Sequence, residues 1–310
     1  DFVTTYDVYP PLYFLYAKVY FEIFGGAGWV LRLAGLVLEV LTLPLIYFSA
    51  WTLAPAGRRR SVGLVALVLA GLSPVMIATA LLARPYPGIY FFFTLCFAAL
   101  SWIATHREVS GRSVFTASGR AAILPYLALA VGIAAMPWLH NLGMLYSLVV
   151  GIVAVLLWWF VLDRNKTIFW NLAAAAIVAA LLYLPNVPVL LRQLGDVGTN
   201  WWLAPPSAAQ LLRSVLHIYG QAPGDVMPSD IAALGIAFLV ILAALYGAAT
   251  LLLRRQTAQF LLLVGLPGLV FFFFVSATYT FKPVLLSRAM YPMLGPWFVL
   301  LACERCSVDL

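Results

Sequence analysis

The chain has 310 residues, of which 64% are hydrophobic and 9% are charged, and its mean hydropathy is +1.00. Soluble domains are about 45–50% apolar and about 25% charged, so this chain has too little polar surface to cover a water-soluble core. The composition therefore excludes a soluble enzyme, a disordered protein and a nucleic-acid binder. The formal net charge is +7, and in a membrane protein the position of each cation matters more than the sum.

Long apolar segments with almost no internal charge recur along the chain. A helix of about 20 such residues crosses the roughly 30 Å hydrocarbon core of a bilayer. The sequence therefore predicts an all-α integral membrane protein, a polytopic bundle of about nine transmembrane helices with external in-plane helices. The predicted spans cover residues 28–53, 61–82, 86–104, 121–138, 141–162, 167–184, 231–253, 258–275 and 288–303.

The positive charges predict the orientation of these spans. Cations concentrate in alternate loops, as the positive-inside rule requires of the cytoplasmic side. Few cations lie on the other side, so each of them is a candidate for a function there. The predicted cytoplasmic cations are Arg58, Arg59, Arg60, Arg107, Arg112, Arg120, Arg164, Lys166, Arg254, Arg255 and Arg305. The predicted external cations are Lys18, Arg84, Arg192, Arg213, Lys282 and Arg288.

We expect one transmembrane domain over residues 1–310. The orientation puts Asp1 outside and makes the first span run inward, so we expect an additional helix upstream of Asp1 in the intact protein. Residues 1–27 would form an external loop. Within it, the apolar segment 11–24 reaches only about 21 Å as a helix. This segment is therefore predicted to lie at the outer surface, with its tyrosine rings at the interface.

A second external loop is predicted over residues 185–230. Trp201 and Trp202 would anchor it at the membrane, and Ser207 and Gln210 have the spacing of a helix capping box. The residues after the capping box alternate at helical spacing, which predicts a second in-plane helix. Its predicted apolar face consists of Ala208, Leu211, Leu212, Val215 and Tyr219, and its polar face of Gln210, Arg213, Ser214 and His217.

An external catalytic site must take its carboxylate from a small set of acids. Asp1 and Asp7 precede Tyr9-Pro10-Pro11, on a stretch that the prolines hold away from a helix. Either carboxylate could face a cleft at the membrane boundary without the cost of burial in lipid. By position alone they also fit two solvated loop acids.

The external cations and one histidine are the complementary candidates. Arg84, Lys282 and Arg288 lie where external loops meet spans, at the depth of a lipid phosphate, and could hold such a group. The alternatives are snorkelling and pairing with lipid headgroups. His140 lies in an outer hairpin, where it could bind acceptor or phosphate, or make a hydrogen bond to the backbone.

Glu39 falls in the middle of the first span, where a carboxylate is costly and is by default a functional hypothesis. We expect it to be protonated or hydrogen-bonded to a neighbouring helix, and a role in donor binding is the alternative. Arg32 precedes it by two turns on the same helix face, nearer the outside. A contact between Asp7 and Arg32 would orient the carboxylate and lower its basicity.

Five groups of short segments stand out along the chain. They are Asp1-Phe2 and Asp7-Val8-Tyr9-Pro10-Pro11-Leu12-Tyr13 with Phe24-Gly25 and Leu31-Arg32-Leu33; Leu72-Ser73-Pro74 with Ala83-Arg84-Pro85-Tyr86; Trp138-Leu139-His140-Asn141; Trp202-Leu203-Ala204-Pro205-Pro206-Ser207; and Ser287-Arg288-Ala289-Met290-Tyr291-Pro292. In order and spacing they are similar to the GT-C class of polyprenyl-phosphate-sugar-dependent glycosyltransferases, and in particular to its protein O-mannosyltransferase-like and lipid A aminoarabinose-transferase-like branch. The resemblance covers nearly the whole chain, as an amino-terminally truncated member.

This resemblance implies an inverting membrane glycosyltransferase that moves a hexosyl or pentosyl group from a polyprenyl-phosphate donor to an acceptor hydroxyl. The acceptor would be a glycan, a lipid or a protein. The site would face the extracytoplasmic side of the plasma or inner membrane. A transporter or lipid flippase without transferase activity is the alternative, because such proteins also carry polar groups within their spans.

The resemblance also implies roles for single residues. An acid of the first external loop acts as the base, so Asp1 and Asp7 are the expected catalytic residues. The expected groups for donor phosphate or substrate are Arg84, Tyr86, His140, Lys282 and Arg288, and Arg32 is the expected orienting residue. No cofactor is implied. A divalent metal is compatible with the class but not indicated, since the three histidines have no metal-ligand spacing.

Overall fold

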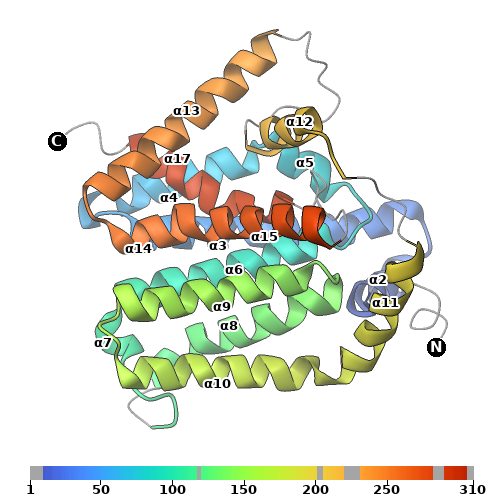
Figure 1. The fold of residues 1–310 in the computed structure, drawn as a ribbon, viewed down its shortest axis with the longest axis horizontal. Helices are drawn as coiled ribbons and strands as arrows, with labels where there is room; N and C mark the ends of the chain where they lie inside the picture. The colour runs from blue at the N-terminus through green and yellow to red at the C-terminus, as the bar shows by residue number, and fades with distance from the viewer. Residues whose placement is uncertain (1–9, 117–119, 201–204, 220–230, 282–289, 306–310) are drawn as a thin grey trace.

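The computed structural model describes residues 10–116, 120–200, 205–219, 231–281 and 290–305. Within these ranges every regular element is a helix (Figure 1), which confirms the predicted fold class. The helices that run along the bundle are α3 (Gly28–Leu53), α4 (Arg59–Gly71), α6 (Tyr86–Thr105), α8 (Arg120–Leu139), α9 (Gly143–Phe160), α10 (Lys166–Tyr183), α13 (Ile231–Leu253), α14 (Thr257–Phe260), η4 (Leu261–Gly265), α15 (Leu266–Thr280) and α17 (Leu294–Arg305). The others are α2 (Leu12–Phe24), η1 (Ala56–Arg58), α5 (Pro74–Ala80), α7 (Arg107–Ser110), η3 (Leu184–Asn186), α11 (Val187–Asn200), α12 (Ala208–Tyr219) and η5 (Tyr291–Met293).

Seven helices in the described ranges are long and apolar enough to cross a membrane, and they match seven of the predicted spans. The span predicted over 61–82 is bent instead, because α4 and α5 meet at 56°. Pro74 disfavours a helical conformation at Ser73, and the Ser73 hydroxyl accepts a hydrogen bond from the backbone of α5's first turn (3.1 Å). Of the last predicted span, 288–303, the described part is the short apolar helix Tyr291–Cys303.

The connections between the spans separate the charges into two ends, as predicted (Figure 1). The end drawn on the left holds η1, α7, the α9–α10 turn and the α13–α14 turn. We call it the arginine-rich end, and its cations are Arg58, Arg59, Arg60, Arg107, Arg112, Arg120, Arg164, Lys166, Arg254 and Arg255. The opposite end holds α2, the α5–α6 loop, the α8–α9 turn, α11 and α12.

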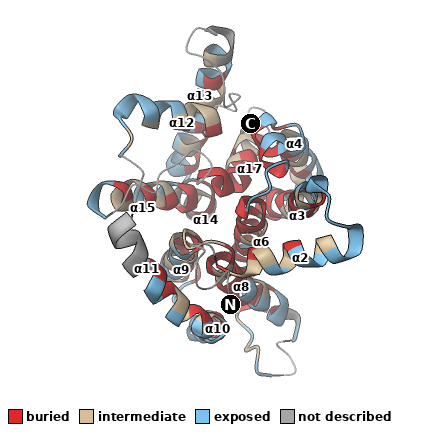
Figure 2. Ribbon diagram, turned by 90° about the vertical axis from the view of Figure 1, so that its right-hand side faces the viewer, coloured by how far each residue is buried: buried red, intermediate tan, exposed pale blue. Residues whose placement is uncertain are grey.

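The helix predicted within residues 11–24 is present as α2. It runs across the bundle. Figure 1 shows α2 end-on and the spans lengthwise, and Figure 2 shows α2 lengthwise and the spans end-on. Tyr13 and Ala17 are buried, and α2 packs on α3 and α8. Burial of Tyr16 raises the pKa of its phenol well above the ordinary value, so this tyrosine stays protonated at any physiological pH.

The predicted capping box is confirmed at the start of α12. The Ser207 N–H donates to Gln210 Oε1 (2.7 Å), and the Gln210 N–H donates to Ser207 Oγ (3.3 Å). Of the predicted apolar face, Leu211 and Tyr219 pack against the core, whereas Leu212 is 59% exposed. Ile218, which was not assigned to that face, is buried. The loop also holds α11, a helix that the sequence pattern did not predict.

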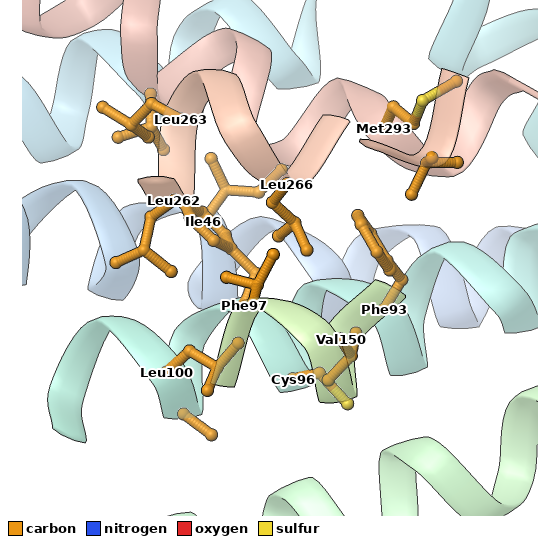
Figure 3. Close-up of a cluster of buried hydrophobic side chains, with 14 of the residues drawn as sticks. Ile46, Phe93, Cys96, Phe97, Leu100, Val150, Leu262, Leu263, Leu266 and Met293 are labelled. Carbon is orange, nitrogen blue, oxygen red and sulfur yellow. The ribbon is translucent and has the colours of Figure 1, made fainter. Parts of the chain in front are cut away.

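The core is built around α6, the most enclosed of the spans (Figure 2). In its most apolar stretch 72% of residues are buried, against 22% to 56% in the other six long helices, so α6 is the central helix. Helix α6 packs against α3, α8, α9 and η5, and Figure 3 shows part of the core around it. The side chains labelled in the close-up are Ile46, Phe93, Cys96, Phe97, Leu100, Val150, Leu262, Leu263, Leu266 and Met293.

The turn between α8 and α9 admits only glycine at position 143. The Gly143 N–H donates to the His140 carbonyl (2.7 Å). A Cβ at this position would collide with the backbone carbonyl of Met136 and would lie 2.7 Å from the nitrogen of Pro137. Because these are backbone atoms, they cannot rotate away as a side chain would. This glycine therefore sets the position of His140 at the opposite end.

We expect Gly143→Ala to lower the free energy of unfolding by about 2 kcal/mol or more, the range for overpacking of a rigid site. Gly151→Ala is the matched control in the same helix, because a Cβ there meets nothing within 4 Å. That change should be neutral or stabilising, since alanine favours a helix. Thermal unfolding of the detergent-purified protein measures both variants, and equal stability would contradict the packing of the turn.

Candidate active site

The structure brings the described candidate residues together at the opposite end of the bundle. Arg84 lies in the α5–α6 loop and Tyr86 begins α6. His140 directly follows α8, and Arg32 lies in the second turn of α3. The other predicted site residues, Asp1, Asp7, Lys282 and Arg288, lie outside the described residues.

Tyr86 and His140 form a stacked pair. Their ring centroids are 5.7 Å apart with an interplanar angle of 30°, and the Tyr86 side chain is buried. The Nδ1 atom of His140 accepts a hydrogen bond from the Leu142 N–H (3.1 Å), which confirms the predicted bond to the backbone. A neutral ring in this arrangement carries its proton on Nε2. The geometry therefore makes His140 a hydrogen-bond donor through Nε2.

The α5–α6 loop is held against the first span. A Cβ at Gly35 would lie 2.8 Å from the carbonyl oxygen of Ala80 and 3.5 Å from that of Leu82, so glycine permits a close backbone approach. The Arg84 N–H donates to the Leu82 carbonyl (2.8 Å), and the Arg84 side chain is exposed. Among the described residues no acid pairs with Arg84. Its planar guanidinium is thus available to an anion such as a phosphate.

Arg32 and Glu39 share a helix face, as predicted, but differ in environment. Arg32 is exposed, whereas Glu39 is only 5% exposed. The physical reason is depth in the bundle: the turn of α3 that holds Glu39 meets Tyr291 of η5, whereas Arg32 lies near the start of α3, on a side of the helix that is exposed. Arg32 is therefore placed where it could reach an external carboxylate, and Glu39 is not.

A buried polar chain lies below these groups. The Tyr291 hydroxyl donates to Oε1 of Glu39, and the Tyr291 ring lies 4.7 Å from that of Tyr90. The Tyr90 hydroxyl in turn donates to the sulfur of Met76 (3.4 Å). Glu39 is therefore hydrogen-bonded to a neighbouring element, as the sequence predicted. Its other oxygen, Oε2, is buried and has no hydrogen-bond partner within the described ranges.

Sequence reasoning missed the two tyrosines of this buried polar chain, Tyr90 and Tyr291. Tyr90 follows Tyr86 by one helical turn, a spacing that could have placed both on one face of α6. Tyr291 belongs to a segment that the family resemblance singled out, but without a role for it. No sequence pattern pairs Glu39 with Tyr291, because 252 positions separate them.

Ligands for a metal ion are sparse in the structure. In the part of the chain that it describes, no three His, Cys, Asp or Glu side chains come close enough together to hold an ion. The chemistry that the described site residues offer is that of exposed guanidinium groups beside a stacked tyrosine and histidine. Such groups bind an anion and orient a hydroxyl-bearing ligand.

We expect Tyr291→Phe to lower the free energy of unfolding by about 1–3 kcal/mol, because a buried Glu39 oxygen loses its donor. Combining it with Glu39→Leu removes both polar groups, so the loss in the double variant should be smaller than the sum of the single losses. Tyr246→Phe is the control, since Tyr246 is 64% exposed. Thermal unfolding measures all four variants, and strict additivity would refute the pairing.

No family model and no curated protein matches this sequence. Among solved structures, the fold is similar to the crystal structure of ArnT from Cupriavidus metallidurans in the apo state, with a TM-score of 0.66 and 15% sequence identity. The match covers 97% of this chain and 50% of that chain, so this chain spans about half the length of ArnT. The chain is thus an integral membrane protein with a GT-C-like fold.

Proposed function

We propose that this chain is a membrane glycosyltransferase of the GT-C type that transfers a hexosyl or pentosyl group from a polyprenyl-phosphate donor to an acceptor hydroxyl. The observation that carries the proposal is the likeness to ArnT, a lipid A aminoarabinose transferase, over nearly the whole chain. The grouping of Arg84, Tyr86 and His140 at the end away from the arginine-rich loops supports it.

The proposed reaction is a direct displacement at the anomeric carbon. The acceptor oxygen forms a bond to that carbon while the bond to the phosphate oxygen breaks, so the configuration inverts. The hydroxyl proton passes to the carboxylate of Asp1 or Asp7. The bonding pair leaves with the polyprenyl phosphate, whose negative charge Arg84, Lys282 and Arg288 stabilise.

The remaining groups position the reactants. Tyr86 and His140 would contact the sugar or the phosphate, with Nε2 of His140 as the donor. Arg32 would orient the catalytic carboxylate, and the contact would lower the basicity of that carboxylate. The acceptor would be a glycan, a lipid or a protein, and surrounding membrane lipids would complete the site.

We further propose that the site faces the extracytoplasmic side of the plasma or inner membrane. Loops rich in Arg and Lys stay in the cytoplasm, and here they all lie at the arginine-rich end. A flippase, the alternative that the sequence left open, needs a polar path between the two ends. Among the described Asp, Glu, Lys, Arg and His residues, Glu39 is the one that is buried within a span, and it is hydrogen-bonded to Tyr291. These observations favour chemistry at one end over passage.

Loss of the proposed base or phosphate ligand should abolish most transfer. We expect Asp7→Asn and Arg84→Ala each to lower kcat about 10²-fold or more. Arg112→Ala removes an exposed cation at the arginine-rich end and should leave transfer unchanged. The assay follows release of farnesyl phosphate from farnesyl-phosphate mannose and farnesyl-phosphate arabinose in membranes that supply the acceptor.

Full activity of both variants would contradict the assigned site. Uptake of a labelled lipid into proteoliposomes by the unaltered protein, insensitive to Asp7→Asn and without release of farnesyl phosphate, would favour the flippase instead.

The proposed orientation is tested by cysteine labelling. Gly26 and Gly57 are exposed glycines at the two ends, and a Cβ at either meets nothing within 4 Å. In a background with the native cysteines replaced by alanine, we expect a membrane-impermeant maleimide to label Gly26→Cys in intact cells. Gly57→Cys should react only after permeabilisation, and the reverse pattern would invert the topology.

A further inference from the structure

A cavity of ≈ 590 Å³ opens at the arginine-rich end, far from the proposed active site. It lies between η1 with the start of α4 on one side and the α13–α14 turn on the other. Helix α17 packs against both α4 and α13, and contributes Leu300 and Cys303 to the cavity wall. The cavity therefore has a wall of buried apolar side chains, namely Val62, Leu251 and Leu300, and a rim of charged residues.

Three arginines form this rim, namely Arg58, Arg59 and Arg254, and no carboxylate is among the described residues that line the cavity. The Arg59 guanidinium carbon lies 4.7 Å from the centroid of the Trp51 ring, a cation–π contact that orients it. The Nε of Arg59 is buried and has no hydrogen-bond partner within the described ranges. A buried donor of this kind is costly unless a ligand satisfies it.

Further donors surround the same space. Gln256 and Gln259 line it with side-chain amides, and the positive φ of Arg255 (55°) turns the chain sharply after α13. Helix α4 begins at Arg59 with no acid in its first turn and no side-chain cap. The partial positive charge of that helix end therefore adds to the charge of the arginines.

We propose that this cavity binds a phosphate group at the arginine-rich end. Guanidinium groups match the geometry of phosphate oxygens and form strong charge-assisted hydrogen bonds with them. The apolar wall would accommodate the glycerol and upper acyl carbons of a phospholipid, and the same cations would also hold a soluble phosphate. Both ligands, the phospholipid and the soluble phosphate, would be held through the phosphate group. They differ because only the phospholipid would gain affinity from the apolar wall.

The experiment is calorimetric titration of the detergent-purified full chain with three probes: dioctanoyl phosphatidic acid, inorganic phosphate and dioctanoyl phosphatidylcholine. We expect phosphatidic acid to bind with a 1:1 stoichiometry and phosphatidylcholine, whose choline cancels the charge, to bind at least tenfold more weakly. Equal affinity for inorganic phosphate would identify a soluble ligand as the source. Much tighter binding of phosphatidic acid would identify a lipid headgroup.

The variants separate a built site from general positive charge. Arg59→Ala should weaken phosphatidic acid binding at least tenfold. Arg59→Lys keeps the charge but loses the planar guanidinium, so its affinity for phosphatidic acid should lie between those of the unaltered protein and Arg59→Ala. Arg60→Ala is the matched control, because Arg60 is the next residue, is exposed and does not line the cavity. It should change the affinity less than twofold.

Two outcomes overturn the proposal: no binding of phosphatidic acid or inorganic phosphate, or equal loss in Arg59→Ala and Arg60→Ala. Should Arg59→Ala unfold at a lower temperature than the unaltered protein, Arg254→Ala replaces it. Arg254 is an exposed residue of the α13–α14 turn, and its replacement is expected to cause the same tenfold loss.

Discussion

Hydrocarbon offers no hydrogen-bond partner, so every backbone group and nearly every buried polar side chain of this protein must find its partner inside the molecule. Helices satisfy the backbone. Hydroxyls within the first span donate to carbonyls one turn earlier, as Thr42 does to Leu38 (2.8 Å) and Ser49 to Leu45 (2.7 Å). One oxygen of the Glu39 carboxyl, Oε1, accepts a hydrogen bond from the Tyr291 hydroxyl. The same constraint moves most ionisable groups out of the spans, and the chain concentrates them at the two ends of the bundle.

The two ends consequently have different chemistry. The arginine-rich end gathers its cations around a cavity with an apolar wall, which suits a phosphate. The opposite end has fewer cations, of which Arg84 and Arg32 are exposed, beside the stacked rings of Tyr86 and His140. Helices α2 and α12 run across this second end (Figures 1 and 2). This arrangement fits the proposed donor, a lipid-linked sugar with its headgroup at the boundary and its tail in the bilayer.

The hydrogen bond between Glu39 and Tyr291 couples these features, because it ties the first span to the beginning of the last helix. Tyr291 also contacts Tyr90 of the central helix, one turn below Tyr86. The α5–α6 loop with Arg84 rests on Gly35, one turn above Glu39. Removing the hydrogen bond would therefore disturb the side chains that support the candidate site, without touching an exposed group.

Local sequence by itself determined the membrane class, seven of the spans, helix α2, the capping box of α12 and the separation of cations, since each depends on residues close together in sequence. Partnerships between distant segments were decided by the tertiary structure. The stack of Tyr86 on His140, the pairing of Glu39 with Tyr291 and the burial of Ile218 on α12 all depend on which helices pack side by side. The bend at Ser73 is local instead, because Pro74 disfavours a helical conformation there. The arginine cavity belongs to this second group, because its cations come from η1, α4 and the α13–α14 turn, and periodicity along one helix carries no information about the contacts of another.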